Sequence, residues 1–181
     1  AFAISRGSKS TAETVMVEIF DGENKGRGEC VPYARYKESR VSVVAQLSGL
    51  EKAVQDGLSR EELQRRLPAG AARCALDCAM WDLEAKQTGK PVWELAGLPE
   101  PVALPTTMTI SLDDAGNMAE AAKATSAKIL KLKLGGADDM DRVEAVHRAR
   151  PDAKLVLDGN EGLAPDDFPN LAARAAELGV V

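Results

Sequence analysis

Lys131 and Lys133 lie two residues apart in the otherwise apolar stretch 129–134, a spacing that can support acid–base chemistry. Leucines alternate with the lysines, as in a β-strand that packs one face on helices and turns the other inward. Two ammonium groups on that inner face are costly to remove from water unless they have a task. Each also disfavours protonation of the other, so one of them can act as a general base near neutral pH.

Gly135-Gly136 follows directly after Leu134, which places Lys133 at the carboxyl end of its strand. Active sites of parallel (β/α) barrels are built at that end. For the lysine pair alone, a solvent-exposed edge strand is the simpler interpretation, since lysine is common at exposed edges. The neighbouring strands must therefore decide between the two interpretations.

The next expected strand, 154–157, leads into Asp158-Gly159-Asn160. Its leucines fit the helix-packed side, so Asp158 faces the interior at the strand tip. A carboxylate oxygen there suits Mg²⁺, a hard cation that takes few protein carboxylates. A turn or helix-capping aspartate is the alternative.

An earlier strand, 104–110, carries Thr107 and Thr109 on one face, although threonine also simply favours strands. Together the three strands bring hydroxyls, a lysine pair and a carboxylate to one rim. That combination suits proton abstraction beside a carboxylate, with a metal holding the resulting enediolate.

Strands and helices alternate from residue 104 onward, which predicts a parallel sheet of a doubly wound or barrel fold. The expected strands are 104–110, 129–134 and 154–157, and the expected helices are 113–126, 138–150 and 166–178. Residues 1–100 instead combine an alternating hairpin with three helices, an α+β unit. One of these helices should begin at Ser59, which has capping-box spacing to Glu62. We therefore expect two domains, 1–100 and 101–181.

Three strand–helix units do not close a barrel, and we expect a further strand to begin at 179–181. A half-barrel leaves exposed strand edges and an uncovered core. We therefore expect the sequence to be part of a longer protein, with residues before Ala1 and after Val181.

The composition limits the class of partner. The 181 residues are 45% hydrophobic and carry a net charge of −5, which supports a core and argues against nucleic-acid or anionic-membrane binding. We expect neither a transmembrane helix nor a signal peptide. Cys74 and Cys78 lie in an apolar helical pattern, which favours buried free thiols in a reducing cytoplasm.

Five segments in order resemble the enolase superfamily, in its muconate-lactonizing-enzyme-like branch, and most of all dipeptide epimerases of the L-Ala-D/L-Glu type. They are 2–7 (FAISRG), 28–36 (GECVPYARY), 75–86 (ALDCAMWDLEAK), 131–133 (KLK) and 158–160 (DGN). The resemblance implies an α+β capping domain followed by the first part of an α/β (β/α)₇β TIM-like barrel, truncated after about three barrel strands.

The resemblance also implies catalytic and metal-binding roles. Lys133 matches the base on one face of the substrate, and Lys131 matches the lysine that contacts the substrate carboxylate and tunes its neighbour. Asp158 matches the first of three carboxylates that hold one Mg²⁺. Asn160 fits the family's DxN pattern and is expected to support Asp158 from beside it.

Substrate-binding residues are implied in the same way. Arg6 is the expected partner for the side-chain carboxylate of a glutamate in the substrate. Thr109 is expected near the substrate at the end of the first barrel strand. Tyr33 lies in the second of two loops expected to close over the site.

The implied activity is Mg²⁺-dependent epimerisation of an L,L-dipeptide such as L-Ala-L-Glu, by α-proton abstraction and enolate stabilisation, in a cytoplasmic homo-oligomeric isomerase. The other two metal ligands and the opposite-face lysine are expected beyond Val181, so we expect these residues alone to be inactive. Alternatives are a muconate cycloisomerase or o-succinylbenzoate synthase of the same superfamily, a Schiff-base aldolase using Lys133, and a non-catalytic barrel fragment.

Overall fold

The computed structural model describes residues 2–5, 7–136 and 138–180. They form two compact units, one of Ala1–Thr11 with Ala103–Val181 and the other of Ala12–Val102. The sequence-based division assigned residues 1–11 to the first domain. In the structure this segment groups with the barrel strands instead.

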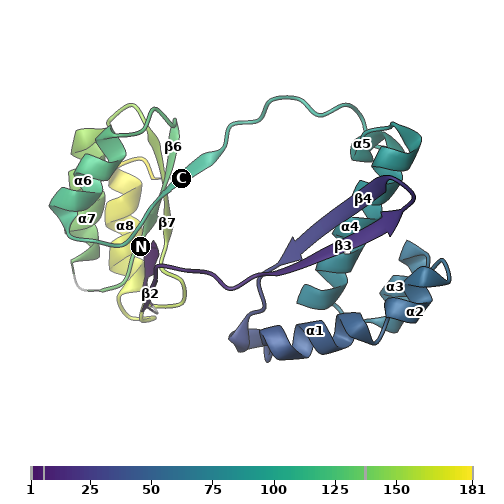
Figure 1. Cartoon of the computed structure of the whole chain (residues 1–181). Helices are drawn as coiled ribbons and strands as arrows, with labels where there is room; N and C mark the ends of the chain where they lie inside the picture. Colours follow the sequence, from purple (N-terminus) through teal and green to yellow (C-terminus); the bar gives the residue numbers. More distant parts are fainter. Residues whose placement is uncertain (1, 6, 137, 181) are drawn as a thin grey trace. The chain divides into compact units, whose positions relative to one another are not determined.

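The barrel unit contains three parallel strands in the order β5-β6-β7. The strands are β5 (Thr107–Ile110), β6 (Ile129–Lys133) and β7 (Lys154–Asp158), and the helices are α6 (Ala115–Lys123), α7 (Asp139–Ala149) and α8 (Phe168–Glu177). Figure 1 shows the three helices along one side of the sheet. Leu130, Leu132 and Leu134 are fully buried in the core on that side. The predicted strand–helix repeat of a partial barrel is confirmed.

A short antiparallel hairpin completes this unit. It pairs β1 (Phe2–Ile4) with β2 (Gly7–Lys9). The apolar start of the sequence indicated a strand over residues 1–4, but not the return strand. The chain turns back on itself around Ser5, whose side chain contacts the loop after β7.

The second unit is the expected α+β arrangement. Its elements are β3 (Val15–Asp21), β4 (Asn24–Cys30), the 3₁₀ turn η1 (Ala34–Tyr36), α1 (Arg40–Ser48), α2 (Glu51–Gln55), α3 (Arg60–Arg66), α4 (Ala71–Thr88) and α5 (Val92–Leu95). In β3, buried or half-buried residues alternate with exposed ones from Val15 to Phe20, as its period of two predicts. The capping box at α3 is present in full, with Ser59 and Glu62 each bonding the other's backbone N–H.

Two glycines of β4 set the distance between this hairpin and α4. A Cβ at Gly26 would collide with the carbonyl oxygen of Ala79, and a Cβ at Gly28 with that of Ala75. Both obstacles are backbone atoms of a helix, so they cannot rotate away. The glycines and the small alanines together let the strand and the helix pack at short distance.

We expect Gly28→Ala to lower the free energy of unfolding by about 3 kcal/mol, because the new methyl group must push α4 off the hairpin. Gly49→Ala is the matched control, since Gly49 has a helical φ of −65° and a Cβ there would meet its nearest neighbour at 3.5 Å. Chemical denaturation measures both variants. Equal stability of the two would contradict the close packing.

The expectation for two of the cysteines is wrong. Cys74 and Cys78 are exposed, and Cys30 is the buried thiol. The cause lies in the helical period: α4 buries Ala71, Ala75 and Ala79 against the hairpin, and positions 74 and 78 lie on a different face. Burial raises the pKa of the Cys30 thiol.

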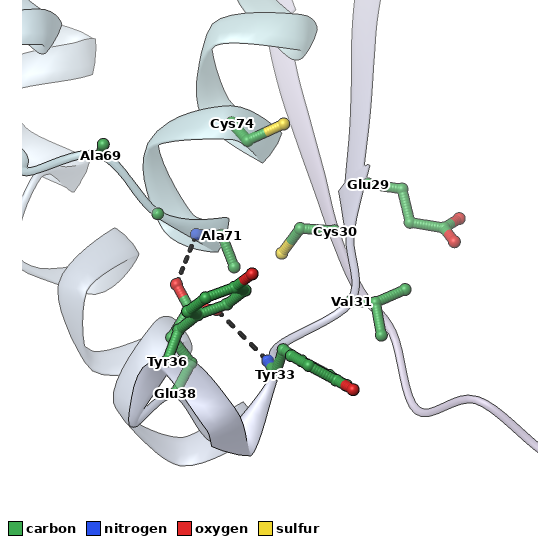
Figure 2. Close-up of a pocket in the computed structure, with 10 residues that line it drawn as sticks. Glu29, Cys30, Val31, Tyr33, Tyr36, Glu38, Ala69, Ala71 and Cys74 are labelled. Carbon is green, nitrogen blue, oxygen red and sulfur yellow. Dashed lines mark hydrogen bonds between the residues drawn. The ribbon is translucent and has the colours of Figure 1, made fainter. Parts of the chain in front are cut away.

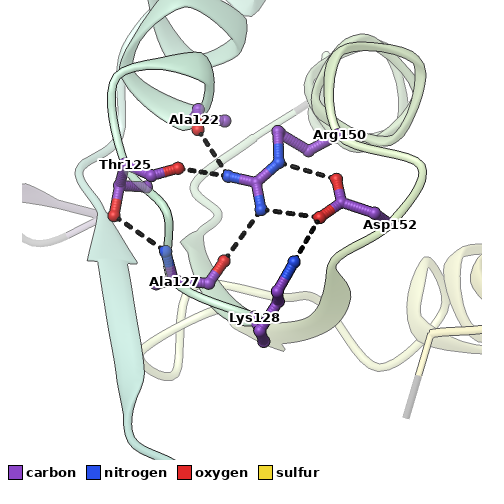
Figure 3. Close-up of polar contacts among 6 residues, drawn as sticks. All are labelled: Ala122, Thr125, Ala127, Lys128, Arg150 and Asp152. Atoms are coloured by element: carbon purple, nitrogen blue, oxygen red, sulfur yellow. Dashed lines mark hydrogen bonds and ion pairs between the residues drawn. The ribbon is translucent and has the colours of Figure 1, made fainter.

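Arg150 connects the segments that precede β6 and β7, at the end of the sheet opposite the lysines (Figure 3). Its guanidinium donates to the backbone carbonyls of Ala122, in the last turn of α6, and of Thr125 and Ala127, between α6 and β6. The same group holds Asp152 through two bonds of 2.8 and 3.0 Å. Arg150, and secondarily Lys128, lower the pKa of Asp152 well below its ordinary range. A planar fork with five donors suits this set of acceptors, and a lysine does not.

Arg150→Lys should therefore lower the melting temperature measurably, because one ammonium group cannot reach three carbonyls and a carboxylate together. The control is Arg148→Lys, since the Arg148 side chain is 70% exposed and its ion pair to Glu144 is long, 3.5 Å. That variant should change the melting temperature by less than about 1 °C. Differential scanning calorimetry on both proteins decides. Equal melting temperatures would mean that Arg150 has no such role.

Candidate active site

The register of the sheet places the predicted site residues in two adjacent rows. Lys131 pairs with Thr109 on β5 and with Val156 on β7. One row further toward the carboxyl ends, Lys133 pairs with Asp158. Since the leucines between the lysines lie on the helix side, both lysines point to the opposite face. The alternative of an exposed edge strand fails, because β6 is the central strand.

Asp158 is the centre of the site. Its Oδ2 atom lies 2.8 Å from the Lys131 Nζ and 2.7 Å from the Lys133 Nζ. Lys133 also donates to Asn160 Oδ1 at 2.8 Å, and the Asn160 backbone N–H donates to Asp158 Oδ1 at 2.9 Å. Four predicted site residues thus form one hydrogen-bonded cluster.

Burial differs between the two lysines. The Lys133 side chain is 8% exposed, whereas the Lys131 side chain is 35% exposed. A nearly buried ammonium is tolerated only with charged or polar partners, and Asp158 and Asn160 supply them. Lys133 is therefore held in one place, while Lys131 remains accessible from solvent.

The two lysines lower the pKa of Asp158 well below its ordinary range. The largest contribution is the hydrogen bond from Lys131, followed by that from Lys133, and the Asn160 N–H adds to both. Partial burial of Asp158 acts in the opposite direction without reversing the shift. The carboxylate is thus ionised throughout the neutral range.

Asp139 is a supporting residue that the sequence pattern did not reveal. It is 3% exposed, and its carboxylate accepts N–H bonds from Gly135 and Gly136, in the loop after β6. Arg142 bonds the same carboxylate at 3.2 Å and the Asp113 carbonyl at 2.8 Å. The loops after β5 and β6 are thereby joined. An acid at the start of a helix, following two glycines, was the available signal.

Of the other predicted substrate residues, Thr109 lies in the described part of the same compact unit as the cluster. Thr109 is half-buried and lies beside Lys131 in the sheet register. Arg6 lies outside the described residues. Tyr33 belongs to the other compact unit, so its predicted contact with substrate stays a prediction.

Tyr33 lines a cavity of about 650 Å³ in its own unit, together with Tyr36 (Figure 2). Glu38 holds the loop that carries both tyrosines. Its carboxylate accepts from the Tyr33 N–H at 3.2 Å and from the Ala71 N–H at 2.6 Å, at the start of α4. One carboxylate thus joins the tyrosine loop to a helix N-terminus, where a negative charge is favourable.

The described residues do not by themselves make a magnesium site. Among them, no group of three histidine, cysteine or acidic side chains is placed to hold a metal ion. Asp158 offers one carboxylate, and both lysines already contact its Oδ2 atom. Mg²⁺ prefers near-octahedral oxygen coordination, and Asp158 can supply at most two of those oxygens.

The fold agrees with comparisons against known proteins. Residues 1–97 match the mandelate racemase / muconate lactonizing enzyme, N-terminal domain family. The chain belongs to this family. Its membership of the enolase superfamily, and its likeness to dipeptide epimerases, are thereby confirmed.

Several family members are similar over nearly the whole chain. The L-Ala-D/L-Glu epimerase of Escherichia coli K12 is 42% identical over 99% of this chain and 57% of its own length. The N-acetyl-D-glutamate racemase of a Pseudoalteromonas species is 39% identical over 92% of this chain and 54% of its length. The chain thus spans about half the length of these relatives.

A crystal structure from Agrobacterium tumefaciens, an enolase family member with homology to dipeptide epimerases, contains sodium and L-Ala-L-Glu. It is 43% identical, superimposes with a TM-score of 0.92, and is matched over 99% of this chain and 55% of its own. In this chain, no helix among the described residues is long and apolar enough to cross a bilayer.

Asp158→Asn should lower the free energy of unfolding by about 2 kcal/mol near pH 6, because it leaves two lysines without their carboxylate. The folded-state pKa of Asp158 lies below its unfolded value of about 3.9. Its contribution is therefore complete above the unfolded pKa and is lost as pH falls toward the folded pKa. The difference between wild type and variant should shrink from about pH 5 downward.

Denaturation at a series of pH values measures this difference. The exposed Asp166 provides a control, and Asp166→Asn should give a difference that stays small at every pH. An Asp158→Asn difference independent of pH would contradict the ion-paired arrangement.

Proposed function

We propose that the whole protein is an isomerase that inverts the α-carbon of an N-acylated glutamate, with L-Ala-L-Glu as the first candidate substrate. The observation that carries the proposal is the cluster at the carboxyl ends of β6 and β7, where Lys133 is buried and Lys131 accessible. Active sites of barrel enzymes lie at that end. The proposal refers to the whole protein because the chain spans about half of its relatives.

Lys133 acts as the base in this proposal. Its unprotonated Nζ takes the α-proton, the C–H bond breaks, and the electron pair moves into the substrate carboxylate as an enolate. The ammonium of Lys131 lies beside Lys133 and balances the new negative charge. A proton delivered to the opposite face completes the inversion. We assign this proton delivery to a second lysine outside these residues.

Two relatives support glutamate as the reacting residue. One is named for L-Ala-D/L-Glu and the other for N-acetyl-D-glutamate, and both names describe a glutamate with an acylated amine. We propose that Arg6 binds the glutamate side-chain carboxylate and that Thr109 and Tyr33 line the substrate site. Acylation removes the positive charge of the amine, so a neighbouring lysine meets no repulsion there.

We propose a Mg²⁺ requirement for the whole protein, with Asp158 as one ligand and Asn160 supporting it. The support is chemical: Asp158 is an ionised carboxylate at a strand tip. Bound Mg²⁺ would supply positive charge to the substrate carboxylate. The remaining oxygen ligands must come from outside the described residues.

The test is exchange of the substrate α-proton in D₂O, followed by proton NMR. Wild-type protein should incorporate deuterium at the glutamate α-carbon of L-Ala-L-Glu. Lys133→Arg should reduce the rate by at least about 100-fold, because guanidinium does not act as a base at neutral pH. Lys154→Arg, the same change at an exposed lysine of the same sheet, should leave the rate unchanged.

Other outcomes distinguish the alternatives. Activity on another superfamily substrate, without exchange into any N-acylglutamate, would reassign the protein to a cycloisomerase or synthase. Borohydride trapping of a substrate adduct on Lys133, without a metal requirement, would indicate a Schiff-base aldolase. Binding to a partner without turnover of any substrate would favour a non-catalytic role.

A further inference from the structure

The turn of the N-terminal hairpin touches the loop that follows Asp158. The Ser5 hydroxyl donates to the Gly159 carbonyl at 3.0 Å and lies 3.4 Å from the Asn160 carbonyl. Ser5 is separated from Gly159 by 154 positions in the chain and from Asn160 by 155. The contact therefore depends on tertiary structure alone.

Two glycines leave the space that this contact needs. A Cβ at Gly162 would lie 2.6 Å from the Ser5 Cβ and 2.8 Å from its Oγ. A Cβ at Gly135 would lie 3.2 Å from the Ser5 Cα. Neither glycine has a positive φ, so the missing side chain is the relevant property of both. The loops after β6 and β7 are thus shaped to receive the hairpin turn.

The contacted loop has an unfavourable backbone. Asn160 and Glu161 both have positive φ angles, 48° and 66°, which residues other than glycine adopt uncommonly. Such residues persist only where several contacts hold them. Here the Asn160 N–H is held by Asp158, the Gly162 N–H by the Gly159 carbonyl, and the loop carbonyls by Ser5.

Asn160 links this loop to the base. Its backbone carbonyl faces Ser5, its backbone N–H binds Asp158, and its side-chain oxygen accepts from Lys133 at 2.8 Å. A rotation of the peptide units at 159–160 would move that acceptor away from the Lys133 Nζ.

We propose that Ser5 is a positioning residue for Lys133 that acts through Asn160. Its hydroxyl holds the 159–162 loop so that Asn160 Oδ1 fixes the Lys133 amine. The inference rests on the proposed function, since it concerns the proposed base. It also makes the hairpin turn part of the site's supporting structure.

The contact can be broken from both sides. Ser5→Ala removes the donor, and Gly162→Ala inserts a methyl group against Ser5. Both should lower kcat for α-proton exchange about tenfold with KM changed by less than about twofold. Ser5→Thr keeps the hydroxyl and should restore most of kcat. Ser8→Ala, at an exposed serine of the same hairpin, should have no effect.

A double-mutant cycle tests whether Ser5 acts through Asn160. In an Asn160→Ala background, Ser5→Ala should change kcat by less than about twofold, because the link to Lys133 is already absent. A full tenfold loss in that background would overturn the proposal, since Ser5 would then act independently of Asn160. Unchanged kcat in Ser5→Ala alone would overturn it equally.

A second readout separates this inference from the proposed function. Brief acetylation with acetic anhydride, followed by peptide mass spectrometry, reports the reactivity of Lys133 relative to Lys154. Ser5→Ala and Gly162→Ala should raise that ratio several-fold, and Ser8→Ala should not. A raised ratio in a protein without exchange activity would support the Ser5 contact and reject the epimerase. Exchange activity with an unchanged ratio would do the reverse.

Discussion

The structure of the site depends on one carboxylate shared by two ammonium groups. Asp158 lies within 2.8 Å of both lysine Nζ atoms, and Lys133 could not remain nearly buried without it. This constraint requires the register of β6 on β7 that places Lys133 opposite Asp158. It also requires the backbone after Asp158 to turn at once, so that Asn160 reaches the same amine.

In both units, glycines allow neighbouring elements to pack at short distance. Gly26 and Gly28 let α4 lie on the β-hairpin, while Gly135 and Gly162 make room for the turn at Ser5. In each case a strand or loop meets backbone or near-backbone atoms of another element. Polar groups then hold the approach: Asp139 for the loop after β6, and Arg150 at the other ends of the strands.

Periodicity predicted most of the elements because local patterning and tertiary packing agree in this chain. The alternation of leucine and lysine in β6 and the capping box at Ser59 both led to the observed structure. The prediction for Cys74 and Cys78 failed because an apolar pattern does not reveal which face of α4 meets the hairpin. Of the hairpin at residues 2–9, the apolar start of the chain indicated the first strand only, because the second is three residues long, too short for a period to show.

The sequence by itself determined the family, the strand–helix order, and the facing of Lys131, Lys133 and Asp158, because alternation along a strand is a local property. Only the tertiary structure decided that both lysines share one oxygen of Asp158 and that Ser5 contacts the Gly159 carbonyl. These contacts join residues 25 or more positions apart. Their geometry follows from the register of neighbouring strands and from glycine gaps between loops, which no local pattern encodes.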